Sequence, residues 1–157
     1  MGSRTKTGFT LIEIMIVVAI VGLLSTLALQ EFWHMTMRAK RAELTLNLDG
    51  IRTSELGYVA EWGEFTSCTL QPPVVPGRRA AAFPATIFTS VDWNQLGWVP
   101  DGKVYGQYQV TATGGGTSQT AQFTASAYSD IDGDMNLTHY QANRAFKPQM
   151  LTGNTVY

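Results

Sequence analysis

The feature that most constrains this chain is an uncharged, apolar run close to its N-terminus. No charged residue occurs in residues 14–30, and apolar side chains dominate residues 9–29. As a helix, residues 9–29 would be about 31 Å long at about 1.5 Å per residue, close to the ~30 Å hydrocarbon core of a bilayer. Arg4 and Lys6 precede the run and no basic residue follows it directly, which favours a cytoplasmic N-terminus. The run therefore predicts a membrane-spanning helix.

Glu13 is the one residue that a plain membrane anchor does not explain. A charge inside an apolar span costs roughly 2.5–3.5 kcal/mol near the membrane centre and less near the interface. The cost falls if the carboxylate meets a cation, or lies in the first turn of a helix where free N–H groups point at it. Cleavage between Gly8 and Phe9 would supply both, because it would free a positive amine at the start of the helix. On hydropathy alone, a single-pass anchor or an uncleaved signal stays open.

Residues 8–13 read GFTLIE, and the apolar run follows them directly. This motif resembles the class III signal of type IV prepilins and type II secretion pseudopilins. In that family a membrane prepilin peptidase cuts after the glycine and methylates the new N-terminal phenylalanine. The resemblance implies that Gly8 is the cleavage residue, that Phe9 becomes the N-methylated terminus, and that Glu13 forms an assembly ion pair with the Phe9 amine of a neighbouring subunit.

The resemblance also implies that the apolar helix packs against other subunits in a helical filament. The expected packing residues are Leu11, Ile12, Ile16, Ile20, Gly22 and Leu23. Gly22 lies where the family commonly has a glycine at which the helix can loosen. Gln30 stands where most major pilins have a proline, which would remove a backbone donor and favour local melting. This departure leaves melting near Gly22 open and is more typical of a minor pilin or a pseudopilin.

Beyond the apolar run, the hydrophobic period predicts that the helix continues to about residue 60. One apolar stripe contains Phe32, Met35, Ala39, Ala42 and Leu46, and a neighbouring stripe contains Leu44, Leu48, Ile51 and Tyr58. Gly50 and Gly57 are positions where such a helix could bend. Arg38, Lys40, Arg41 and Glu43 are interpreted as a solvated or subunit-facing charged strip. Such a long helix is typical of an anchor whose outer half packs on a head domain.

Alternating apolar residues predict antiparallel strands in the rest of the chain. The expected strands are residues 103–112, 120–128 and 137–142, with a turn at the glycines 114–116. The proline-rich residues 62–100 predict a long connection that holds one short strand at 86–90. The predicted fold class is α+β: a long N-terminal helix, membrane-spanning and then amphipathic, packed on a small antiparallel sheet. The predicted divisions are a cleaved leader at 1–8, a helix at 9–60 that is transmembrane over 9–29 before assembly, and a head at 61–157.

An acidic loop is the one candidate metal site in the sequence. Asp130, Asp132 and Asp134 alternate before the last predicted strand, and their oxygens could converge on Ca²⁺. The glycine is displaced from the helical calcium-loop pattern, and Gln141 stands where a bidentate glutamate is needed. Asp and Gly are also ordinary turn residues. We therefore assign no metal or other cofactor, and keep these three aspartates as the calcium candidates.

Composition and motifs do not favour an enzyme or a nucleic-acid-binding protein. The net charge of −1 provides no strong basic field. Cys68 is the only cysteine, so an intrachain disulfide is excluded, and a free, partly buried thiol is expected there. His34 and His139 lack the spacing of a zinc site.

These observations predict a structural subunit of a type IV pilus, either a major or a minor pilin. Its expected partners are other pilins or copies of itself, the prepilin peptidase and an inner-membrane assembly machine. The expected location is the bacterial inner membrane for the precursor, and the extracellular pilus or a periplasm-spanning pseudopilus after assembly. The alternatives are a pseudopilin of a type II secretion or DNA-uptake system and a single-pass, membrane-anchored binding domain.

Overall fold

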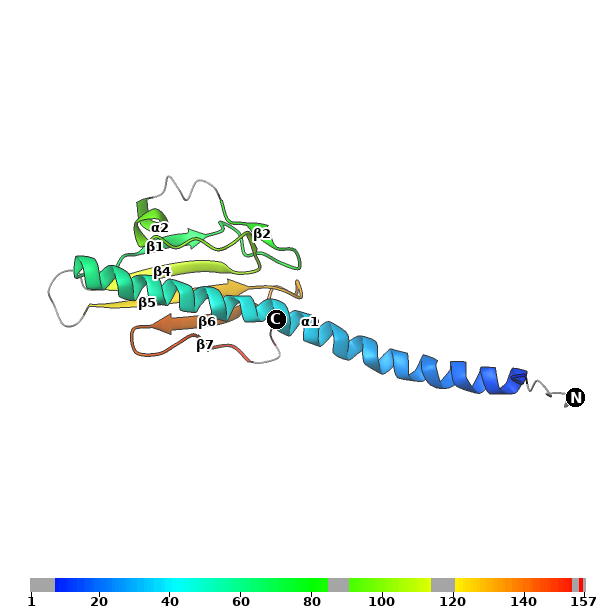
Figure 1. Ribbon diagram of the computed structural model, residues 1–157. Coiled ribbons are helices and arrows are strands. Elements are labelled where there is room, and N and C mark those ends of the chain that lie inside the picture. The colour runs from blue at the N-terminus through cyan, green and yellow to red at the C-terminus, as the bar shows by residue number, and fades with distance from the viewer. Residues whose placement is uncertain (1–7, 85–90, 114–120, 154–155, 157) are drawn as a thin grey trace, which may run out of the picture. The chain divides into compact units, whose positions relative to one another are not determined.

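The computed structural model describes residues 8–84, 91–113, 121–153 and 156 (Figure 1). The chain forms two compact units, residues 1–36 and 37–157. The long helix α1 (Leu11–Trp62) belongs to both units, so the first unit is its N-terminal part and the second is its remainder with the head. Among the described residues, α1 is long and apolar enough to cross a membrane. The structure thus confirms a long N-terminal helix, with bounds Leu11–Trp62.

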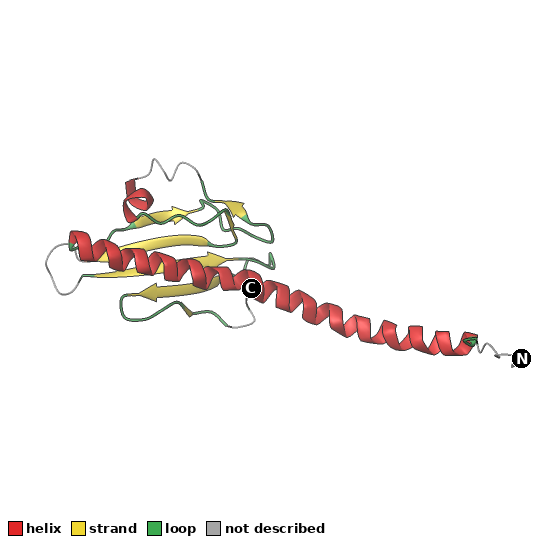
Figure 2. Cartoon of the chain, in the orientation of Figure 1, coloured by secondary structure: helices red, strands yellow, loops and turns green. Residues whose placement is uncertain are grey.

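The second unit is built on an antiparallel sheet that lies against the head-side part of α1 (Figure 2). In the described part of the chain this sheet has five strands in the order β1-β4-β5-β6-β7. Their bounds are β1 Cys68–Gln71, β4 Gln107–Thr113, β5 Gln122–Ser129, β6 Thr138–Asn143 and β7 Gln149–Met150. A small second sheet pairs β2 (Ala81–Ala82) with β3 (Lys103–Val104), and a short helix α2 spans Val91–Leu96. The predicted α+β class is confirmed.

One face of α1 forms part of the hydrophobic core. The second predicted stripe, Leu44, Leu48, Ile51 and Tyr58, is buried. The inward residues predicted for β5, Ala121, Phe123, Ala125 and Ala127, are buried with it. In contrast, the first predicted stripe has its large side chains Phe32, Met35 and Leu46 exposed. Periodicity located both stripes, but only the sheet selects which one becomes core.

The predicted strand at 103–112 is interrupted, because Tyr105 and Gly106 separate β3 from β4. A Cβ at Gly106 would lie 2.8 Å from the Tyr108 hydroxyl oxygen and 3.2 Å from Leu44 Cγ. Only glycine lets the backbone pass this close to the helix. The register of β4 on β5, with Val110 opposite Ala125, continues the apolar face beyond the break.

The prediction of a long connection at 62–100 with a single strand was wrong. This segment contains β1, β2 and α2. Strand β1 pairs with β4, and its outer edge is bonded by α2: the Thr69 amide donates to Asp92 Oδ2 (2.8 Å), and Trp93 Nε1 donates to the Thr69 carbonyl (2.7 Å). These elements are too short to produce a period in the sequence. The strand expected at 86–90 and the glycine turn at 114–116 lie outside the described residues.

The interpretation of Arg38, Lys40, Arg41 and Glu43 as a solvated or subunit-facing strip fails at two of its members. Arg41 is buried and donates to the Val156 carbonyl (2.8 Å). Glu43 Oε1 accepts the Tyr105 amide (3.0 Å), and burial raises the pKa of this half-buried carboxyl. These two charges bond groups of the head far away in sequence, so local pattern could not reveal their burial.

Candidate processing and assembly site

The predicted cleavage position lies in a non-helical segment directly before α1. Gly8, Phe9 and Thr10 precede the helix, and the Phe9 side chain is 85% exposed. A Cβ built on Gly8 would meet nothing within 4 Å. In this chain the peptide bond between Gly8 and Phe9 is therefore open to a protease, and any need for glycine at residue 8 would come from the enzyme that cuts there.

Glu13 lies in the first turn of α1 and caps the helix together with Thr10. The Thr10 amide donates to Glu13 Oε2 (2.8 Å), and the Thr10 hydroxyl donates to the same oxygen (2.7 Å). In return the Glu13 amide approaches the Thr10 hydroxyl at 3.4 Å. This reciprocal arrangement is a capping box, whose sequence signature is Thr-x-x-Glu. Thr10 is thus a residue that the sequence analysis missed, although its spacing from Glu13 could have identified it.

The capping box gives Glu13 a partner within its own chain. Both hydrogen bonds from Thr10 end on Oε2. A carboxylate has two oxygens that accept, so Glu13 can cap its own helix and still meet a cation through Oε1. The predicted ion pair with a neighbouring Phe9 amine is compatible with this geometry.

The residues predicted to pack in a filament lie along an apolar helix with no covered side. Leu11, Ile12, Ile16, Ile20 and Leu23 are all exposed, and a Cβ at Gly22 would meet nothing within 4 Å. The most apolar window of α1 has none of its residues buried. A helix that is apolar all round is stable only inside lipid or among other helices.

Polar groups within this helix are satisfied by the helix itself. The Ser25 hydroxyl donates to the Val21 carbonyl and the Thr26 hydroxyl to the Leu23 carbonyl, each at 2.7 Å. Bonds of this kind back to the preceding turn remove the need for water. Backbone and side-chain donors must be satisfied in this way inside a bilayer.

The structure brings the three predicted calcium candidates together. One carboxylate oxygen from each of Asp130, Asp132 and Asp134 lies within 4.8 Å of the others. Asp130 Oδ1 accepts the Gly133 amide (2.9 Å) and the Asp134 amide (3.1 Å). These bonds build a tight turn in which Gly133 has a φ of 74°. The turn is therefore stabilised by its own hydrogen bonds. Its acidic oxygens are also close enough together to contact one cation.

The pKa values of two carboxyl groups in this loop, Asp132 and Asp134, are shifted in opposite directions. Burial raises the pKa of Asp132, and the nearby Asp134 and Asp130 charges add to this. Hydrogen bonds from the Asn136 side chain and backbone lower the pKa of Asp134. The Arg78 Nε donates to the Asp132 carbonyl (2.8 Å), which connects the loop to the proline-rich segment. A bound cation would lower the pKa of Asp132 and of Asp134, because it favours the charged carboxylates.

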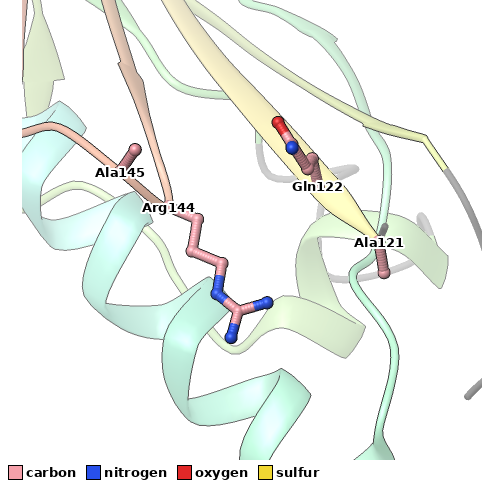
Figure 3. Close-up of a pocket in the computed structure, with 4 residues that line it drawn as sticks. All are labelled: Ala121, Gln122, Arg144 and Ala145. Carbon is pink, nitrogen blue, oxygen red and sulfur yellow. The ribbon is translucent and has the colours of Figure 1, made fainter. Parts of the chain in front are cut away.

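The remaining candidates for chemistry are separated from one another. Cys68 is buried, and burial raises the pKa of its thiol far above the usual range, so it is a poor nucleophile. His139 stacks on Tyr128 with ring centroids 4.5 Å apart, and burial lowers its pKa. A pocket on the head is lined by Ala121, Gln122, Arg144 and Ala145 (Figure 3). It contains none of the predicted site residues.

Comparison with known proteins agrees with the geometry of the N-terminal segment. Residues 3–29 match the family model of the prokaryotic N-terminal methylation motif. The chain is 35% identical over 71 residues to the type IV major pilin protein PilA of Myxococcus xanthus, covering 45% of this chain and 32% of that protein. It is 43% identical over 62 residues to a fimbrial protein of Neisseria meningitidis, covering 40% of this chain and 36% of that protein.

A third relative, a fimbrial protein of Moraxella nonliquefaciens, is 47% identical over 51 residues, covering 32% of this chain and 33% of that protein. The chain thus spans about a third of the length of these curated relatives. No solved structure matches the chain. Sequence similarity therefore supports the processing motif most directly, and the head is understood through its own packing.

Proposed function

We propose that the chain is a structural subunit of a type IV pilus, as a major or minor pilin, because its N-terminal segment matches the prokaryotic N-terminal methylation motif. The observation that carries the proposal is an exposed Gly8-Phe9 bond before a capped helix that is apolar on every side. Such a helix suits two environments in turn. It spans the inner membrane in the precursor, with the N-terminus cytoplasmic, and packs among identical or related helices in an extracellular filament.

Processing begins at residue 8 in this proposal. A prepilin peptidase cuts after Gly8, and the released Phe9 amine is methylated. The cut removes the leader and leaves a positive amine next to the capped first turn. An inner-membrane machine then extracts the subunit, and its exposed apolar helix is transferred from lipid to other helices without passing through water.

Glu13 sets the axial register of each subunit relative to its neighbour during assembly. Each Glu13 pairs with the Phe9 amine of a neighbouring subunit while Thr10 keeps its hydrogen bonds to Oε2. Desolvation offsets much of the attraction in a buried ion pair, so the pair contributes specificity more than stability. Dispersion and apolar burial by the Leu, Ile and Val side chains supply most of the cohesion.

The cleavage step is tested by Gly8→Ser in the cells that produce the protein. We expect the substituted chain to remain as a precursor, because a side chain at residue 8 obstructs the peptidase. Intact-mass spectrometry distinguishes a retained leader from a methylated Phe9 terminus. Gly22→Ser is the matched control and should be processed normally. Mature-length protein from the Gly8 variant would remove Gly8 from the cleavage site.

The assembly pair is tested by comparing Glu13→Gln with Thr10→Ala. Glutamine can keep the capping box but carries no charge, whereas Thr10→Ala loses the cap and keeps the charge. We expect both variants to be cleaved, and Glu13→Gln to lose filaments that Thr10→Ala still forms, as counted by electron microscopy. The opposite ranking would assign Glu13 to helix capping and end the ion-pair role.

Two observations favour a pseudopilin of a secretion or DNA-uptake system as the second candidate. Gln30 replaces the usual proline, and the three loop aspartates lie close enough together to contact Ca²⁺. We propose a calcium titration of the full chain in detergent by isothermal calorimetry, with Asp132→Asn as the comparison. Saturable binding that this substitution abolishes would favour the pseudopilin. A simple anchored binding domain would instead retain residues 1–8 and associate with no filament.

A further inference from the structure

An aromatic pair follows the apolar run of α1 at the point where polar residues begin. Phe32 is 62% exposed and Trp33 is 56% exposed. They lie three and four residues after Leu29, so they share its face of the helix. Gln30 and Glu31 stand between them and the apolar run. The pair therefore extends an apolar face into the first polar turn.

The position of Trp33 along the helix corresponds to the edge of a bilayer. From Leu11 to Trp33 the axial rise is about 33 Å, at about 1.5 Å per residue. The hydrocarbon core is about 30 Å thick, and the headgroup regions extend a bilayer to about 40–45 Å. With the start of α1 at one boundary of the core, Trp33 falls just beyond the opposite boundary.

The chemistry of the pair fits that boundary. An indole ring has an apolar body and one N–H donor, so it is most stable where acyl chains meet headgroups. Phe32 supplies a purely apolar ring beside it. The hydroxyls of Ser25 and Thr26, which precede the pair, are bonded within the helix, whereas Glu31 brings the first charge after Glu13. The helix surface thus changes from uncharged to charged within one turn before Trp33.

We propose that Phe32 and Trp33 are an interfacial anchor that holds the precursor at a fixed depth in the phospholipid bilayer. Their partner is the headgroup–acyl boundary at the C-terminal end of the span. The inference rests on the proposed membrane-anchored precursor. It adds a depth-setting surface, because a ring at this boundary resists both deeper insertion and withdrawal.

The test uses the full-length precursor reconstituted in phosphatidylcholine vesicles whose acyl chains carry bromine at shallow or deep carbons. Subtracting the emission of Trp33→Phe from that of the unmodified chain isolates the signal of Trp33 from the other tryptophans. We expect a blue-shifted difference spectrum that loses more intensity with shallow bromines than with deep ones. Trp62, also exposed on α1, is the matched control. The Trp62→Phe difference should be insensitive to bromine.

A second variant distinguishes failure of the proposed membrane span from failure of the interfacial role of Phe32 and Trp33. Ile20→Trp, made in the Trp33→Phe background, reports the middle of the span. If that reporter is quenched by deep bromines while Trp33 is insensitive to both, the interfacial role is overturned and the membrane span stands. If neither position is quenched, both are overturned. Stronger quenching of Trp33 by deep bromines than by shallow ones would also overturn the interfacial role.

Discussion

The two halves of α1 have the same backbone structure but opposite surroundings. In residues 11–36 the side chains are mostly apolar and mostly exposed. In residues 37–62 one face is buried in the core with Leu44, Leu48 and Ile51. The first half needs an environment that the chain itself does not provide, whereas the second half is stabilised by its own head.

The polar groups of the two halves differ in the same way. Ser25 and Thr26 bond carbonyls of their own helix. In the head-side half, Arg52 Nε donates to the Asn143 carbonyl (2.9 Å), and Glu55 Oε2 accepts the Thr66 amide (3.3 Å). One half is a self-contained rod, and the other is joined to its head by bonds from charged side chains.

The largest effect is expected from Leu48→Ala in the head-side half. Leu48 is fully buried, and removing such a side chain leaves a cavity. We expect a loss of about 2–5 kcal/mol in the free energy of unfolding of the head. Urea unfolding of the full chain in detergent, followed by near-ultraviolet circular dichroism, measures it. Leu24→Ala, in the exposed half, should leave this value unchanged, and an equal loss there would show that the halves are one cooperative unit.

The next effect concerns Glu55, which is fully buried. Its Oε1 has no hydrogen-bond partner among the described residues. Burial raises its pKa to about 7, and the Thr66 amide only partly opposes this. The folded head therefore binds a proton more tightly than the unfolded chain. Stability is complete below about pH 4.5 and is lost as pH rises through about 7, by on the order of 2 kcal/mol.

Glu55→Gln should flatten that pH dependence, since glutamine stays neutral. Unfolding free energies of the full chain in detergent at mildly acidic and mildly alkaline pH provide the measurement. Glu61→Gln is the matched control, because Glu61 lies on the same helix and is exposed. A slope that persists in the Glu55 variant would assign the titration to other carboxyls, such as Glu43.

The smallest effect, with opposite signs, is expected at two glycines of the head-side half. A Cβ at Gly50 would lie 2.7 Å from Trp98 Nε1, whereas one at Gly57 would meet nothing within 4 Å. The Trp98 ring is held between Trp93 and Tyr108, with centroids 5.6 and 5.8 Å away, so it cannot yield freely. Gly50→Ala should lose about 1 kcal/mol because the clash exceeds the gain in helix propensity.

Gly57→Ala should instead gain up to about 1 kcal/mol, because alanine favours the helix and has open space. Thermal unfolding of both variants in one detergent gives the comparison directly. A gain at both positions would mean that Trp98 moves aside without cost. The close approach of Trp98 also explains Gly50 in a way that the sequence-based expectation of a bend did not include.

Much of the fold could be predicted because it depends on local patterns. The apolar run, the 3.6-residue period up to Tyr58 and the alternation around Phe123 each arise within one segment. The Gly8–Glu13 motif likewise lies within six residues, so its position beside the helix followed directly. The Thr10 capping box was equally local, and only its signature was overlooked.

The sequence by itself determined that this chain has an apolar helix with a processing motif and a sheet-containing head, because periodicity and motifs need no distant partner. Only the tertiary structure decided which stripe of α1 is buried, why Arg41 and Glu55 leave solvent, and that β1 and α2 form within a proline-rich segment. Each of these depends on groups far away in sequence, such as Val156 for Arg41 and β4 for β1. Burial is a property of the assembled neighbours, and a side chain's own segment cannot specify it.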